Sequence, residues 1–189
     1  MTHKYDPTHA HHLDSLFRRL MYPPVKILKH IGLQPDDIFC DIGAGTGFFS
    51  IPASGLLPKG KVIAVDIQPA MIQLLSQKIM DLHINNIETV VSTENDLLLP
   101  QESITFAFMS FVLHEVENKE QMLCTIYNAL RSDGKIAIIE FSKKALFGPP
   151  KHERISENEI KKLLENAGFN DISLEKYNFF AYLAKARKL

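Results

Sequence analysis

At 189 residues the chain has the length of one domain and can bury about 70% of its unfolded surface, so it needs neither disulfides nor a metal to fold. Its formal net charge is −1, with Lys and Arg scattered, which predicts no binding surface for nucleic acid or an acidic membrane. No apolar run is long enough to span a bilayer as a helix. Cys40 and Cys124 are expected to be buried thiols, and the polar N-terminus is no signal peptide, so a cytoplasmic protein is expected.

The first segment, residues 1–22, is polar and ends before Pro23-Pro24. Its clustered imidazoles are the kind of side chain that binds zinc: His3, His9, His11 and His12. No cysteine or carboxylate set completes a site, so we expect solvated histidines and no metal. A helix over Val25 to Ile31 follows. Residues 1–22 are therefore expected to form an arm or lid, and residues 23–189 to form one domain.

A glycine-rich turn follows the first expected strand, Ile38 to Asp41. The turn reads Asp41-Ile42-Gly43-Ala44-Gly45-Thr46-Gly47, and a helix-like segment begins after it at Phe48. Strand, glycine turn and helix is the arrangement by which an α/β domain brings a nucleotide-like ligand against backbone N–H groups and a helix N-terminus. Glycine suits such a turn because it adopts φ > 0 and allows close approach.

The spacing of these glycines differs from that of a dinucleotide site. Phe48 occupies the position where a dinucleotide fold has its third glycine, and an acid, Asp41, precedes the turn. A carboxylate suits a ligand with an ammonium group better than it suits a pyrophosphate. S-adenosylmethionine has an adenosine, a sulfonium and an α-amino acid but no phosphate, so the turn is interpreted as a loop for that molecule. A tight turn without a ligand is the alternative.

A second acid ends the second expected strand, Lys61 to Asp66. Asp66 lies about 20 residues beyond the first glycines, where nucleotide-binding folds place the acid that accepts hydrogen bonds from ribose hydroxyls. The alternative is an acidic helix N-cap, since Pro69 follows three residues later. The next elements follow from apolar periodicity and turn residues. They are a helix over Ala70 to Leu82, a strand over Ile87 to Val91, a buried strand over Phe106 to Phe111, a helix over Lys119 to Leu130, a strand over Ile136 to Phe141, a capped helix starting at Ser156, and two strands over Ile172 to Tyr177 and Phe180 to Ala186.

The glycine loop, Asp66, the stretch Val112-Leu113-His114-Glu115-Val116 and the strand order together resemble the class I S-adenosylmethionine-dependent methyltransferases, over residues 25–189. The resemblance implies an α/β fold: a Rossmann-like, doubly wound, mostly parallel seven-stranded sheet with an antiparallel C-terminal hairpin. It implies in-line transfer of a methyl group to an unidentified small-molecule acceptor. A monomer or homodimer is expected.

The resemblance also implies which residues hold S-adenosylmethionine. Asp41 and the glycine-loop amides would hold its amino-acid end, and Asp66 its ribose. Thr93 stands where related enzymes usually have the acid that binds the adenine amino group, so Glu94 or the local backbone is expected to serve instead. The remaining residues expected at the cofactor are Gly43, Ala44, Gly45, Gly47, Ile67, Ser110 and Phe111.

On the acceptor side, His114, Glu140 and His152 are candidates for a general base if the acceptor is protonated at neutral pH. A structural histidine is the alternative for His114. Three other functions stay open. A nicotinamide oxidoreductase would need a third glycine near Phe48, and an arsenite methyltransferase would need more cysteines. The third is a non-catalytic protein that binds the cofactor and partners another protein. It stays open because Thr93 and Thr105 depart from the family pattern, which usually has an aspartate at the position of Thr105.

The arm leads to a first prediction. If residues 1–22 form a lid over the acceptor, deleting them should reduce the rate of methyl transfer more than it weakens cofactor binding, because the cofactor's expected contacts lie elsewhere. Turnover assays and cofactor titration of the truncated chain measure the two effects. Equal losses in both would contradict a lid.

Overall fold

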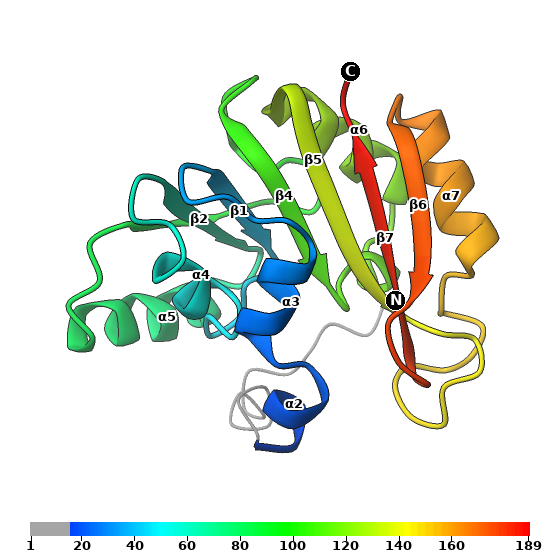
Figure 1. Ribbon diagram of the computed structural model, residues 1–189, viewed down its shortest axis with the longest axis horizontal. Helices are drawn as coiled ribbons and strands as arrows, with labels where there is room; N and C mark the ends of the chain where they lie inside the picture. The colour runs from blue at the N-terminus through cyan, green and yellow to red at the C-terminus, as the bar shows by residue number, and fades with distance from the viewer. Residues whose placement is uncertain (1–15) are drawn as a thin grey trace.

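Seven strands form one mixed sheet in the computed structural model of the chain, which describes residues 16–189 (Figure 1). They are β1 Ile38–Ile42, β2 Lys61–Asp66, β3 Ile87–Val91, β4 Ile104–Ser110, β5 Leu130–Phe141, β6 Asn170–Lys176 and β7 Ala181–Arg187. The order across the sheet is β3-β2-β1-β4-β5-β7-β6. β1 to β5 pair in parallel, and β7 runs antiparallel between β5 and β6. The expected Rossmann-like fold with its C-terminal hairpin is confirmed.

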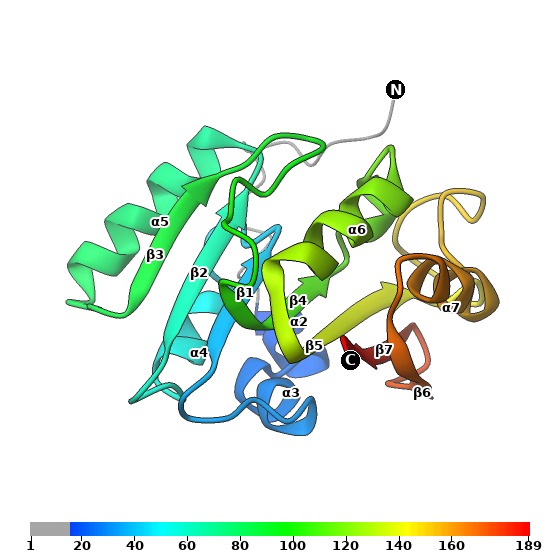
Figure 2. The ribbon, with the colours of Figure 1, turned by 90° about the horizontal axis from the view of Figure 1, so that it is seen from above.

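Helices cover both faces of this sheet. They are α2 Leu16–Met21, α3 Pro24–His30, α4 Ser50–Ser54, α5 Pro69–Asp81, α6 Lys119–Ala129 and α7 Glu157–Asn166, with a short 3₁₀ helix, η2, at Leu113–Glu115. Figure 2 shows α3 and α4 on one side of the sheet and α6 and α7 on the other. Because parallel strands need crossover connections, the helices are placed where they bury both faces.

Alternation along the central strands divides the core into two apolar layers. In β4, Phe106 and Phe108 pack with α3 and α4, whereas Ala107 and Met109 pack with α6 and α7. All four side chains are buried. A period of two places successive residues on opposite faces, so a strand buried on both faces reads as a continuous apolar run. This explains why the apolar runs in the sequence predicted the central strands.

The parallel register brings the carboxyl ends of four strands to one edge of the sheet. β1, β2, β4 and β5 end at Ile42, Asp66, Ser110 and Phe141. After β1 the chain adds β2 and β3 on one side of that strand, and it then crosses over to add β4 and β5 on the other side. The strand order therefore reverses at β1. A doubly wound sheet binds ligands in the crevice at such a point.

The two cysteines differ in burial. Cys40 is buried in β1, but Cys124 is exposed, so the expectation of two buried thiols is wrong for Cys124. Its position on α6 falls outside the apolar stripe, which is made by Met122, Leu123 and Ile126.

Thr105, which stands where related methyltransferases usually have an aspartate, has a structural role. Its hydroxyl donates to Asp37 Oδ1 at 2.7 Å and accepts from the Ile38 amide at 2.9 Å, which ties β4 to the start of β1.

No helix in residues 16–189 is long and apolar enough to cross a bilayer. The capped helix expected to start at Ser156 is confirmed, since Ser156 and Glu159 form a capping box at the start of α7. The histidine-rich stretch lies outside the described residues.

Gly47 gives a test of packing in the turn after β1. Its φ is +89°, and a Cβ would lie 2.5 Å from Leu75 Cδ1. Gly47→Ala should therefore lower the free energy of unfolding by about 2–4 kcal/mol, through backbone strain plus overpacking. Gly32→Ala is the matched control, because Gly32 has φ +83° with nothing near its Cβ position. Urea unfolding should show a clearly smaller loss for Gly32→Ala; equal losses would exclude the packing contribution.

Candidate active site

A cavity of about 920 Å³ opens at the carboxyl ends of β1, β2 and β4. This lies within the range of roughly 300–1,000 Å³ that is usual for ligand sites. One part of the wall comes from the glycine loop, Asp66 and the segment 92–94, and the other from aromatic residues around His114. The cavity is thus long enough to have two chemically different ends, and it coincides with the crevice that the topology predicts.

The glycine loop forms one wall, but its amides are bonded within the protein. Gly43 and Ala44 donate to the Val65 carbonyl at 2.8 and 3.0 Å, and Gly47 donates to Ala44. The Gly45 amide donates to Asp66 Oδ2 at 2.8 Å. These four amides are therefore bonded within the protein, and their expected role at the cofactor's amino-acid end stays a prediction. Gly43 also allows close packing, since a Cβ there would clash with Val112.

Asp66 lies on the cavity wall at the end of β2. Oδ2 accepts from the Gly45 amide, and Oδ1 accepts from the Gln68 amide at 2.9 Å. Burial raises the pKa of Asp66, and these amide hydrogen bonds oppose the rise. A carboxylate can accept about four hydrogen bonds, and the amides of Gly45, Ile67 and Gln68 act on this one, so Asp66 retains acceptor capacity for a ligand. The alternative expectation for Asp66 is a helix N-cap. It accepts from an amide at the start of α5, but Gln68 is the N-cap residue of that helix.

Asp41 lies beneath the glycine loop and not on the cavity wall. The Ser50 hydroxyl donates to its Oδ2 at 2.5 Å. Burial raises the pKa of Asp41 to about 6, opposed by the Ser50 bond and the positive charge of Arg18. Asp41 can therefore act on a cationic ligand through its charge but does not reach into the cavity.

The segment after β3 provides the third acid of this end. Ser92, Thr93 and Glu94 line the cavity. The Thr93 hydroxyl accepts from the Asp96 amide at 3.0 Å and donates to the Asp96 carbonyl, so it closes a local turn. The departure at Thr93 thus leaves Glu94 as the acid on this part of the wall, as the sequence suggested.

Ser110 and Phe111 lie where β4 ends. The Ser110 hydroxyl is buried on the cavity wall and has no hydrogen-bond partner among the described residues. A buried polar atom without a protein partner is uncommon, and this hydroxyl is placed to bond a ligand in the cavity. Phe111 has φ +59°, and its ring contacts Phe141 and Tyr22 at centroid distances of 4.3 and 4.9 Å. Ile67 also lines the cavity, whereas Gly47 packs against Leu75.

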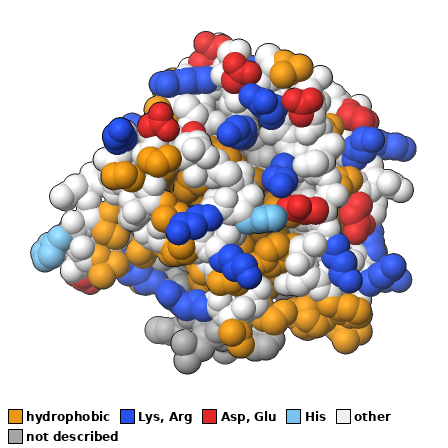
Figure 3. All heavy atoms as spheres, in the orientation of Figure 1, with side chains coloured by type: hydrophobic (Ala, Val, Ile, Leu, Met, Phe, Trp, Pro, Cys, Tyr) orange, Lys and Arg blue, Asp and Glu red, His pale blue; other side chains and the backbone are white. Residues whose placement is uncertain are grey.

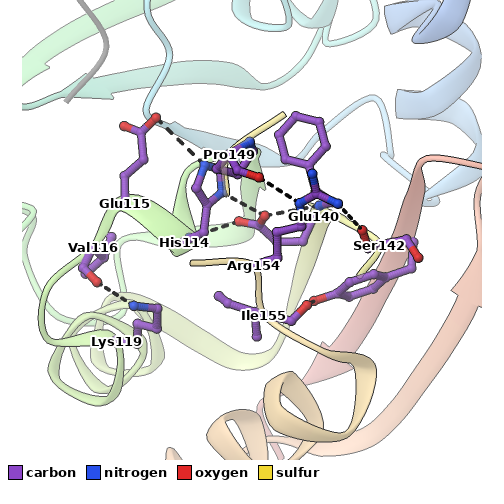
Figure 4. A network of polar contacts seen from close by, with 11 residues as sticks. His114, Glu115, Val116, Lys119, Glu140, Ser142, Pro149, Arg154 and Ile155 are labelled. Carbon is purple, nitrogen blue, oxygen red and sulfur yellow. Dashed lines mark hydrogen bonds and ion pairs between the residues drawn. The ribbon is translucent and has the colours of Figure 1, made fainter. Parts of the chain in front are cut away.

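His114 and Glu140 form a buried pair at the other end (Figure 4). Glu140 Oε2 lies 2.8 Å from His114 Nδ1, and Oε1 accepts from the His114 amide at 3.1 Å. Glu140 is fully buried and does not line the cavity, whereas His114 does. A carboxylate can only accept, so Nδ1 carries the proton and Nε2 of neutral His114 is left as the acceptor.

Opposing effects act on the pKa of His114. Burial lowers it, but the hydrogen bond and negative charge of Glu140 raise it. The charges of Glu115 and Glu153 add to the rise, and the net pKa lies above the ordinary histidine value. Nε2 lies 3.9 Å from Glu115 Oε1. This arrangement can accept and hold a proton, which the alternative of a purely structural histidine does not require.

The structure does not bring His152 to the cavity. Its side chain is 81% exposed, and Nε2 lies 3.6 Å from Glu153 Oε1. The wall instead contains residues that the sequence did not single out: Arg18, Met21, Tyr22 and Glu153. Nothing in the sequence distinguishes them, because they become neighbours only through the fold. Groups of three or more metal-binding side chains are absent from the described residues.

Comparison with known proteins agrees with this architecture. A model of the methyltransferase domain family matches residues 33–184. A crystal structure of an S-adenosylmethionine-dependent methyltransferase from Aquifex aeolicus is 31% identical, with a TM-score of 0.92 over 98% of this chain and 100% of that one. The chain belongs to the class I S-adenosylmethionine-dependent methyltransferases. The matches favour neither a nicotinamide oxidoreductase, nor an arsenite methyltransferase, nor a non-catalytic cofactor-binding protein.

Curated relatives of this methyltransferase share a narrower region. A demethylmenaquinone methyltransferase from Oceanobacillus iheyensis is 30% identical over 122 residues, which are 64% of this chain and 51% of that protein. A ubiquinone/menaquinone biosynthesis C-methyltransferase from Pasteurella multocida is 31% identical over 117 residues, 61% of this chain and 44% of that protein. The chain thus spans about half the length of the curated relatives it matches.

The cavity of this methyltransferase fits its cofactor. S-adenosylmethionine is cationic at the sulfonium and the amino group, and Asp41, Asp66 and Glu94 place three acids at or beneath one end of the cavity. The spare acceptor capacity of Asp66 suits a ribose diol. The unpartnered Ser110 hydroxyl supplies a further polar contact on the same wall.

The raised pKa of Asp41 predicts a stability that depends on pH. The native state binds this proton more tightly than the unfolded state does, so stability falls as pH rises from about 4 through 6. Asp41→Asn removes this loss and should raise the free energy of unfolding at pH 7–8 by roughly 1–3 kcal/mol, with the gain vanishing near pH 4. Denaturant unfolding across pH measures it. Asp36→Asn, on an exposed turn, controls for net charge, and a gain independent of pH would contradict the assignment.

Proposed function

We propose that the chain transfers a methyl group from S-adenosylmethionine to a small acceptor that loses a proton in the reaction, with His114 as the general base. The observation that carries this proposal is the buried His114–Glu140 pair on the wall of the cavity. When bound, the cofactor supplies a methyl group already activated by the sulfonium. The protein's own work is then to bind, to align the acceptor, to exclude water and to remove a proton.

For the cofactor end, we assign the ribose hydroxyls to Asp66, because its carboxylate retains acceptor capacity on the cavity wall. We assign the adenine amino group to Glu94, since Thr93 is engaged in its own turn. Asp41 would act on the amino-acid end by charge alone. The remaining contacts would come from Gly43, Ala44, Gly45, Ile67, Ser110 and Phe111.

For the acceptor end, His114 Nε2 would take the proton while Glu140 fixes the tautomer and stabilises the resulting imidazolium. Glu140 does not reach the cavity, so it is a positioning residue. General bases placed in this way contribute about 10²–10⁴-fold in rate. The fixed Nδ1–H bond at 2.8 Å keeps the imidazole from rotating away from the acceptor.

The walls of the acceptor end favour a flat, largely apolar molecule. Tyr22, Phe111, Phe141 and Phe147 line it, and aromatic faces pack against planar ligands. The Oceanobacillus relative is named a demethylmenaquinone methyltransferase. We propose an acceptor that presents a planar, apolar ring to this wall. The segment 16–22 would close this end, because Arg18, Met21 and Tyr22 line the cavity.

The assignment of Asp66 is tested by direct binding. Asp66→Ala should weaken S-adenosylmethionine binding about 10- to 100-fold, through the loss of hydrogen bonds to a charged acceptor. Isothermal titration calorimetry measures the change. Glu88→Ala is the control, because Glu88 is exposed on β3 away from the cavity and should leave the affinity unchanged. Unchanged affinity of Asp66→Ala, or binding of a nicotinamide dinucleotide instead, would contradict the proposal.

The role of His114 is tested by pH dependence. Because a base must be neutral, kcat should rise with pH through the raised pKa of His114. Glu140→Gln removes the charge that raises this pKa, so the rising limb should move to lower pH and the plateau should fall. NMR titration of the His114 ring should show the same displacement. His114→Gln should lower kcat about 10²–10⁴-fold. A limb that stays in place in Glu140→Gln would make the pair purely structural.

A further inference from the structure

Three segments that are far apart in the sequence border the mouth of the cavity and contain no acid. Residues 16–22, 142–152 and 176–180 hold two, three and one of the chain's 21 Lys and Arg residues and none of its 22 Asp and Glu residues. The first two segments contribute directly to the cavity wall. Six Lys and Arg residues thus lie here, in a chain whose net charge is −1, and the flanking acids are Glu153 and Glu175.

Side-chain and backbone contacts join these segments into one surface. Tyr22 stacks on Tyr177 at 5.9 Å, and Phe147 packs on Phe180 at 4.2 Å between ring centroids. The Ser142 amide donates to the Phe180 carbonyl at 2.9 Å. In Figure 1, α2, the connection after β5 and the turn between β6 and β7 all lie at the lower end of the molecule.

Large apolar side chains project from the same surface. Leu20 is 81%, Leu146 82% and Phe179 58% exposed, and Phe147 is also exposed. Figure 3 shows hydrophobic side chains gathered at the lower right edge, where the connection after β5 and the end of the β6–β7 hairpin lie. Single exposed apolar residues are ordinary, but a contiguous group beside a cavity marks an interaction surface.

Arg154 holds the 142–150 loop in this outward position (Figure 4). Its buried guanidinium donates to the carbonyls of Ala145 at 2.7 Å and Pro149 at 2.8 Å, with longer contacts to Ser142 and Phe147. A loop fixed by several charge-assisted hydrogen bonds presents its apolar side chains in a set geometry. Leu146 is thus exposed because its backbone is held, not because the loop lacks contacts.

We propose that this surface docks on an anionic lipid bilayer, with the mouth of the cavity facing the membrane. The docking patch consists of Leu20, Leu146, Phe147 and Phe179 together with Arg19, Lys143, Lys144, Lys151 and Lys176. Exposed apolar side chains ringed by cations match the acyl boundary and the phosphate layer of such a bilayer. The acids that flank these segments, Glu153 and Glu175, lie close to basic side chains, His152 for Glu153 and His30 and Lys185 for Glu175. This is peripheral docking and needs no spanning helix. It differs from the prediction, based on the scattered cations of the sequence, that no acidic membrane is bound.

Vesicle sedimentation of the full chain tests the proposal and requires no methyl acceptor, so it stands apart from the proposed reaction. The protein should sediment with vesicles of phosphatidylcholine mixed with phosphatidylglycerol, less with phosphatidylcholine alone, and less at high salt. Lys144→Glu combined with Lys151→Glu should weaken binding to the mixed vesicles at least about tenfold. Leu146→Ser combined with Phe179→Ser should weaken binding to both kinds of vesicle by a similar factor.

The matched control is Lys59→Glu combined with Lys162→Glu, which makes the same charge change at exposed positions outside the patch. This control should sediment like the unmodified chain. Loss of binding in the control would show attraction by net charge alone and would overturn the docking patch. Absence of binding to either kind of vesicle would also overturn it. If, in addition, the chain self-associates and Leu146→Ser with Phe179→Ser abolishes this, the surface belongs to a second copy of the chain.

Discussion

The fully buried carboxylate of Glu140 organises the acceptor half of the molecule. It accepts from the amide and ring of His114 and from the Phe141 amide, so it joins the segment after β4 to the end of β5. A buried charge is tolerated only when its lone pairs are satisfied. That requirement fixes His114 against the cavity, and Phe141 then packs with Phe111. The chemistry proposed for His114 and the shape of the aromatic wall therefore share one structural origin.

Charge and close packing shape the cofactor half of the cavity. The glycine loop folds onto Val65 and Asp66, and its missing side chains allow Val112 to approach Gly43. Acids at or beneath this wall oppose the positive charge of a sulfonium and an ammonium group. Burial raises the pKa of Asp41, so its ionised form is expected to lower stability at neutral pH.

The two ends of the cavity and its rim differ in chemical character. Asp66 and Glu94 lie at the cofactor end, aromatic rings lie around His114 together with Glu115 and Glu153, and cations with exposed apolar side chains lie beside the mouth. A methyl acceptor and the cofactor would thus approach from surfaces with different physical properties. Arg154 connects the rim to the interior, since it holds the loop that contributes to both the wall and the docking patch.

Local patterns in the sequence determined the strands, most helices, the glycine turn and Asp66, because periodicity and backbone preference act between near neighbours. β2 and β3 have the predicted bounds. Only the tertiary structure decided that Glu140 orients His114, that His152 faces solvent, that Cys124 is exposed, and that three acid-free segments meet at one mouth. Each of these depends on which distant segments the fold brings together. A pattern along the chain carries no information about which of those segments become neighbours.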